Sequence, residues 1–98
     1  MKYVISEDKL NKIIEKFILS QLGDYKPNNS PIIGDFYLNG RLTARVYRQN
    51  RKVFADIDGD IYKTIMNMFS INAVELENIL GGVFSDITQN NISEIYVL

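Results

Sequence analysis

The stretch that most constrains the fold is residues 32–58, which has the pattern of a three-stranded antiparallel meander. Apolar and polar residues alternate along three runs, 32–38, 42–48 and 52–58. The turn signals Asn39-Gly40 and Gln49-Asn50 separate these runs, and such dipeptides between alternating segments predict hairpins. The sequence therefore predicts a sheet with one apolar face and one polar, largely charged face.

The length of the first turn decides which residues share a face, because a slip of one residue exchanges the two faces. A two-residue turn at Asn39-Gly40 would mix apolar residues with arginines. We therefore expect a longer turn, with Gly40 as a bulge residue, followed by an even second turn. The apolar face then holds Ile32, Phe36, Leu38, Leu42, Ala44, Val46, Val53, Ala55 and Ile57. The opposite face holds Asp35, Tyr37, Thr43, Arg45, Tyr47, Phe54, Asp56 and Asp58.

Three helices are predicted around the meander. Residues 7–22 carry apolar residues at helical spacing, with Ser6 as N-cap and Gly23 just past the end. A short helix, capped by Asp58 or Asp60, is expected to reach about residue 69. The last helix follows Asn72, and its apolar spacing continues through Gly81-Gly82. We expect this glycine pair to let another backbone pack closely against the helix.

The whole chain, 1–98, is expected to be a single α+β domain. It should hold a three- to four-stranded antiparallel sheet, covered on one face by two or three helices. Residues 24–31 form a polar segment with two prolines, which predicts a loop and a hinge. Helix 7–22 could then be a semi-detached N-terminal arm.

Residues 92–98 predict a final strand, which joins an edge of the sheet, pairs with residues 3–5, or pairs with a second copy. An apolar terminal strand is an adhesive edge that other chains can join. Tyr96, Val97 and Leu98 are therefore the candidates for self-association. We expect a homodimer or a docked partner to protect this edge.

Composition removes most catalytic chemistry. The chain has no His and no Cys, so it lacks the commonest general base, the commonest transition-metal ligand and any thiolate nucleophile. No nucleophile elbow and no phosphate-binding glycine loop occur. We therefore expect a protein that is not an enzyme and that uses no cofactor.

The run Asp56-Ile57-Asp58-Gly59-Asp60 invites a metal interpretation. An EF-hand loop beginning at Asp56 would need Gly and Glu where the chain has Ile61 and Asn67, so this motif is excluded. A looser Mg²⁺ or Ca²⁺ site is the alternative to a solvated strand end whose last Asp caps a helix. We favour the cap and predict no metal site.

Residues 61–88 resemble a helix-turn-helix in spacing. The second helix, however, offers Glu75 and Glu77 and has no cation, so phosphate would repel it. The net charge of −1 likewise gives no bulk attraction to nucleic acid. A helical hairpin of the core is the better interpretation of this segment.

The β-hairpin 41–54 is the strongest binding feature of the sequence. It carries five basic residues and interleaved aromatics. Arg45 is expected to pair with Asp35 and Asp56, which leaves the unpaired charge near the hairpin tip. The candidate contacts for a protein partner or a nucleic acid are Tyr47, Arg48, Arg51, Lys52 and Phe54.

The opening segment Tyr3-Val4-Ile5-Ser6-Glu7, followed by Leu10, Ile13, Ile14 and Phe17, resembles the start of many small uncharacterised proteins of tailed bacteriophages. The segment Val53-Phe54-Ala55-Asp56-Ile57 is similar in pattern to later parts of such proteins. The resemblance implies a phage or prophage source and no defined activity, and it carries over no functional residues.

These observations together predict a non-enzymatic protein–protein interaction module, phage-encoded, acting as a small virion accessory or a host-directed effector. Its partner would be a second copy, a virion protein or a host protein. The alternative is a nucleic-acid-binding module that uses hairpin 41–54. No apolar run approaches the ~20 residues that span a bilayer, and the first residues turn polar too soon for a secretory signal. We therefore expect no membrane partner and a location in the host cytoplasm or the virion.

Overall fold

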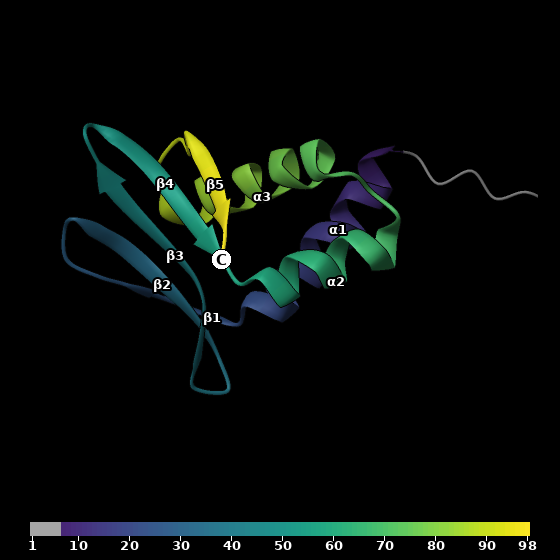
Figure 1. The fold of residues 1–98 in the computed structure, drawn as a ribbon, viewed down its shortest axis with the longest axis horizontal. Coiled ribbons are helices and arrows are strands. Elements are labelled where there is room, and N and C mark those ends of the chain that lie inside the picture. The colour runs from purple at the N-terminus through teal and green to yellow at the C-terminus, as the bar shows by residue number, and fades with distance from the viewer. Residues whose placement is uncertain (1–6) are drawn as a thin grey trace, which may run out of the picture.

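The computed structural model describes residues 7–98, and it is an α+β fold with a mostly antiparallel sheet (Figure 1). The expected cap Ser6 and the short segment 3–5 lie outside these residues. The helices are α1 (Glu7–Leu22), α2 (Gly59–Phe69) and α3 (Ala73–Thr88). The strands are β1 (Asp24–Pro27), β2 (Ile32–Leu38), β3 (Arg41–Gln49), β4 (Lys52–Ile57) and β5 (Glu94–Val97).

The five strands lie in the order β1-β2-β3-β4-β5. The first four pair antiparallel, and β5 returns through α2 and α3 to lie parallel to β4. Figure 1 shows the three helices on one side of the sheet. We call the face toward the helices the inner face and the other the outer face. Of the three pairings expected for the final strand, the one with an edge of the meander is confirmed.

Helix α1 is an integral part of the core. Its residues Ile14, Ile18 and Leu22 are at most 1% exposed, and burying one such side chain contributes about 1.5–3 kcal/mol. The prediction of a semi-detached arm at 7–22 was therefore wrong. The core also holds Phe36, Ala44, Val46, Val53, Ala55, Ile57, Tyr62, Ile65, Leu76, Leu80, Val83 and Phe84.

The first turn of the meander differs from the expected one. Leu38 pairs with Arg41, so Asn39 and Gly40 form a two-residue turn, with φ of 54° and 79°. Positive φ at both central residues is what a type I′ hairpin turn requires. The expected bulge at Gly40 was therefore misplaced.

The extra residue lies inside β3, at Thr43. Phe36 pairs with Ala44 while Tyr37 pairs with Leu42, so Thr43 has no partner between them. This bulge keeps Ala44 and Val46 on the inner face, as predicted. It also turns Leu42 outward, where it is 41% exposed, and Thr43 inward, where it is 3% exposed.

A buried hydroxyl explains why Thr43 is tolerated there. Its Oγ1 donates to the carbonyl oxygen of Leu22 at 2.6 Å and lies 3.1 Å from that of Phe36. The last carbonyl groups of a helix have no partner within the helix, so this contact satisfies one of them. The bulge thus joins the end of α1 to the middle of the sheet.

A second irregularity affects the start of β2. Ile32 pairs with Tyr47 and Gly34 pairs with Val46, which leaves Ile33 as an extra residue. Ile33 therefore packs against the core, and Ile32 moves to the outer face. The second hairpin turn is even, as predicted, with Gln49 paired to Lys52.

The segment predicted as a loop at 24–31 begins with a strand. Tyr25 of β1 pairs with Phe36, and the two rings lie 5.0 Å apart. Pro27 ends this edge strand, where a missing backbone donor costs little. Tyr25 is the one apolar residue of this strand, between Asp24 and the Lys26-Pro27 pair. A single apolar residue is too weak a pattern to predict a strand.

The predicted caps of α2 and α3 are present. The carboxylate of Asp58 accepts from the backbone N–H of Ile61 at 3.2 Å, and the side chain of Asn72 accepts from that of Glu75 at 2.8 Å. Helix α3 runs unbroken through Gly81-Gly82. No other backbone among residues 7–98 packs closely against the glycines, however, because a Cβ at either would meet nothing within 4 Å in this part of the chain.

Replacing Gly81 and Gly82 with alanine is expected to stabilise the protein. Interior helical glycine costs about 0.5–1 kcal/mol relative to alanine, and there is open space for the methyl groups. The double variant should therefore gain roughly 1–2 kcal/mol in the free energy of unfolding, measured by urea denaturation. Ser85→Ala, on the same helix, should change it by only about 0.5 kcal/mol. A loss of stability in the double variant would contradict this packing.

Candidate protein-binding face

The outer face carries three aromatic side chains in one row across β3, β4 and β5. Tyr47 and Phe54 are paired residues whose rings lie 5.8 Å apart, at an interplanar angle of 33°. Phe54 and Tyr96 lie 5.7 Å apart at 36°. We call Tyr47, Phe54 and Tyr96 the aromatic row. Because the helices lie on the other side of the sheet, no helix among residues 7–98 covers it. Tyr47 and Phe54 are half-buried, and Tyr96 is 44% exposed.

Two carboxylates are held beside these rings. The hydroxyl of Tyr47 donates to Asp56 at 3.1 Å, and that of Tyr96 donates to Glu94 at 2.8 Å. Burial raises the pKa of Tyr47, and the charge of Asp56 adds to the effect. The hydrogen bond to Glu94 raises the pKa of Tyr96. The row is therefore an apolar surface bordered by negative charge at neutral pH.

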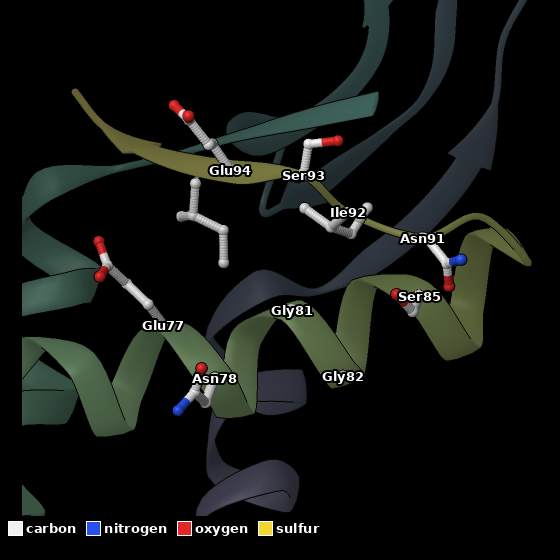
Figure 2. Close-up of a pocket in the computed structure, with 10 residues that line it drawn as sticks. Glu77, Asn78, Gly81, Gly82, Ser85, Asn91, Ile92, Ser93 and Glu94 are labelled. Atoms are coloured by element: carbon white, nitrogen blue, oxygen red, sulfur yellow. The ribbon is translucent and has the colours of Figure 1, made fainter. Parts of the chain in front are cut away.

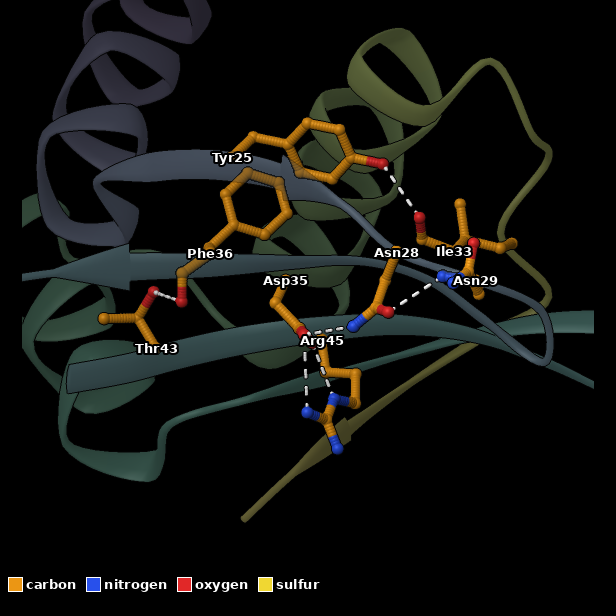
Figure 3. Close-up of polar contacts among 8 residues, drawn as sticks. All are labelled: Tyr25, Asn28, Asn29, Ile33, Asp35, Phe36, Thr43 and Arg45. Atoms are coloured by element: carbon orange, nitrogen blue, oxygen red, sulfur yellow. Dashed lines mark hydrogen bonds and ion pairs between the residues drawn. The ribbon is translucent and has the colours of Figure 1, made fainter. Parts of the chain in front are cut away.

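An ion pair with a buried carboxylate lies farther along the outer face, on β2 and β3 (Figure 3). Asp35 is 2% exposed, and its carboxylate accepts from Arg45 Nε at 2.6 Å and from Asn28 Nδ2 at 3.0 Å. Burial alone would raise the pKa of Asp35, but the hydrogen bonds from Arg45 and Asn28 and the charge of Arg45 outweigh it and lower the pKa. The expected Arg45–Asp35 pair is present, while Asp56 accepts from Tyr47 instead.

Replacing Asp35 with asparagine is expected to destabilise the protein by about 1–2 kcal/mol near neutral pH. The loss is modest because the Arg45 side chain is 38% exposed and partly solvated. Since the folded pKa of Asp35 lies below its ordinary value of 3.8, the stabilisation is present above that pH and disappears as the pH falls through the folded pKa.

The measurement is urea unfolding of wild type and Asp35→Asn from pH 2 to pH 7. The two curves of unfolding free energy against pH should converge in acid and separate above about pH 4. Asp24→Asn is the matched control, because Asp24 is exposed on β1 with no ion pair among the described residues. A constant difference between wild type and Asp35→Asn at every pH would contradict this role for Asp35.

The basic residues of hairpin 41–54 are dispersed rather than gathered on one face. Arg41 pairs with Asp58 at 2.9 Å, and Arg45 pairs with Asp35. Arg48 donates to Asn90 at 3.1 Å, in the segment between α3 and β5, and so lies away from the aromatic row. Arg51 and Lys52 are exposed at the β3–β4 turn and have no ion pair among residues 7–98. The structure therefore brings Tyr47 and Phe54 together but separates them from Arg48.

The sequence placed Tyr96 with Val97 and Leu98 as candidates for self-association. In the structure Tyr96 joins the aromatic row, and Val97 and Leu98 are 42% and 77% exposed at the end of β5. Alternation along 92–98 already placed Glu94 and Tyr96 on one side of the strand. Only the parallel pairing of β5 with β4 reveals that this side adjoins Phe54.

The acidic residues of the run 56–60 make separate contacts and do not converge on one point. Asp56 accepts from Tyr47, and Asp58 caps α2 and pairs with Arg41. Within residues 7–98, no group of three or more acidic side chains is arranged to hold a metal ion. The same part of the chain contains no helix with the length and apolar character needed to cross a membrane.

Comparisons of the chain with protein-family models, with curated proteins and with solved structures gave no match in any of the three.

Proposed function

We propose that this protein is a non-enzymatic protein–protein interaction module whose binding surface is the outer face around the aromatic row. The observation that carries the proposal is the contact of Tyr47, Phe54 and Tyr96 on a sheet face without covering helices. Aromatic side chains are enriched where proteins bind one another, because they bury a large area and lose little conformational entropy.

The charge beside the row favours a protein partner that presents Lys or Arg. Cations are attracted to aromatic faces, and Asp56 and Glu94 add two negative charges at the same surface. The phosphates of a nucleic acid would meet these carboxylates first. The nucleic-acid alternative therefore rests on Arg51 and Lys52 at the hairpin tip, with Arg48 committed to Asn90.

The sequence pattern extends the proposal to the biological setting. Its resemblance to small tailed-phage proteins supports a phage-encoded module that acts as a virion accessory or a host-directed effector. The partner would then be a virion protein, a host protein or a second copy of this chain.

The test uses affinity capture from an extract of the cells in which the protein is naturally made. Titration calorimetry with the purified partner follows. The double variant Phe54→Ser, Tyr96→Ser should weaken binding by about 30-fold or more, the effect of losing a binding hot spot. Lys63→Ser, on the exposed side of α2, is the matched control and should bind like wild type. Binding that is unchanged in the double variant would overturn the proposal.

The nucleic-acid alternative makes a separate prediction. A fluorescent single-stranded oligonucleotide should bind at low salt, weaken as salt rises, and lose affinity when Arg51 and Lys52 are replaced by Glu. No change in fluorescence anisotropy at low salt would exclude it.

A further inference from the structure

A groove separates α3 from β5 at the edge of the sheet. It has a volume of about 660 Å³, and Figure 2 shows β5 and the segment before it lying across α3. On the helix side the lining residues are Glu77, Asn78, Gly81, Gly82 and Ser85. The groove is open because the two glycines present no side chain where α3 faces it.

Strand β5 has an unpaired edge beside this groove. It is the last strand in the sheet order, with β4 on one side and no strand among residues 7–98 on the other. An exposed edge offers backbone N–H and C=O groups to any extended segment that can reach it. Adding a strand to such an edge is a common way for a protein to bind a peptide, and neighbouring pockets then select its side chains.

The two glycines are not required by the packing of the fold. They lie inside a helix, where each costs stability, and a Cβ at either would meet nothing within 4 Å. Alanine would therefore fit in the structure as it stands. The effect of the glycines in the structure is to keep the groove wide. A wide groove favours the binding of a ligand there.

The charge of the groove indicates which kind of peptide it would bind. Glu77 and Glu94 lie toward one end (Figure 2), and no cation among residues 7–98 lines the groove. The chain has no Lys or Arg after Lys63. A second copy that paired its own β5 with this edge would thus bring another Glu94 and no compensating charge. A basic segment is complementary in charge, and an acidic one is not.

We propose that the groove between α3 and β5 binds an extended basic peptide segment, which adds as a sixth strand to β5. The four residues of β5 can pair with a segment of about four to six residues. Alternate side chains of that segment would enter the groove toward Gly81, and its Lys or Arg side chains would meet Glu77. Glu94 borders both the groove and the aromatic row, and Tyr96 lies on β5, but the lining residues of α3 belong to the groove alone. Variants of α3 therefore test this proposal separately from the proposed function.

The experiment titrates ¹⁵N-labelled protein with an acetylated, amidated hexapeptide of alternating Lys and Val. The amide signals of residues 93–97 and 77–85 should shift, and those of the aromatic row on β3 and β4 should not. A hexapeptide of alternating Glu and Val should bind at least about tenfold more weakly. In a Lys-Val strand the N–H groups of all the valines point to one side. Methylating those nitrogens should abolish binding if that side pairs with β5.

Variants of the groove complete the test. Gly81→Leu fills the groove and should weaken binding of the Lys-Val peptide at least about tenfold, while its urea denaturation confirms that it folds. Glu77→Gln should weaken binding and reduce its dependence on salt. Lys63→Ser, on the exposed side of α2, leaves the groove intact and should bind the peptide like wild type.

Three results would overturn the proposal. The first is equal binding of the Glu-Val and Lys-Val peptides. The second is full binding by Gly81→Leu. The third is light scattering that shows a dimer, together with peptide titrations that leave residues 93–97 unshifted, since a second copy would then occupy the edge.

Discussion

Phe84→Ala is expected to lower the free energy of unfolding by about 3–5 kcal/mol, the largest effect of any single side chain considered. Phe84 is fully buried, and its ring meets the edge of Phe36 at 5.5 Å. Phe36 in turn contacts Tyr25, so one aromatic cluster joins α3 to the sheet as far as β1. Domains of this size are stable by only about 5–15 kcal/mol, so this variant should lose a large fraction of its stability at 25 °C.

Phe54→Ala is the matched control, because it removes the same ring from the opposite face of the sheet. Phe54 is only half-buried and contacts Tyr47 and Tyr96, so its loss should cost about 1–1.5 kcal/mol. Urea denaturation of both variants measures the difference. Equal losses would mean that the outer face is as much a core as the inner face, and that it is not free for a partner.

Gly23→Ala is expected to destabilise the protein by about 3 kcal/mol or more, through two separate causes. Gly23 ends α1 with φ of +80°, a conformation that costs an L residue about 1–2 kcal/mol. In addition, a Cβ at this position would lie 2.1 Å from the carbonyl oxygen of Tyr37, in the backbone of β2. Helix α1 or strand β2 must therefore move to accommodate the methyl group.

Gly40→Ala separates these two causes. Gly40 has nearly the same φ, +79°, but a Cβ there would meet nothing within 4 Å. It should therefore cost only the conformational term, about 1–2 kcal/mol. Thermal and urea unfolding of both variants test the contact between the end of α1 and β2. Equal losses for Gly23→Ala and Gly40→Ala would show that this close approach does not exist.

The sequence predicted the elements whose signals are local. The caps at Asp58 and Asn72, the continuous α3 and the even turn before Lys52 all follow from short patterns of residues. The pairing of Arg45 with Asp35 followed from alternation along two neighbouring strands. The patterns behind the caps, the helix and the turn lie within a few residues of those features, and the ion pair joins neighbouring strands of one hairpin.

The errors share a different cause, because they depend on contacts between distant parts of the chain. The bulge at Thr43 exists where a hydroxyl can reach the carbonyl of Leu22, which no pattern within 32–58 encodes. Strand β1 depends on Tyr25 packing on Phe36. In both cases the deciding contact is tertiary.

Only part of the candidate site could be predicted from the sequence, for the same reason. Tyr47 and Phe54 were identified together because they face each other across one hairpin. Tyr96 joins them only after the chain has passed through α2 and α3 and returned beside β4. Arg48 was grouped with them by its position in the hairpin, but it is directed toward Asn90.

The central claim, that the outer face binds a protein, is tested most directly by photo-crosslinking. A benzophenone-bearing phenylalanine analogue replaces Phe54 in one sample and Lys63 of α2, on the helical side, in the other. In the producing cells the protein should form a discrete cross-link to a protein from position 54 and none from position 63. Cross-linking to nucleic acid from position 54, or the same protein adducts from both positions, would contradict it.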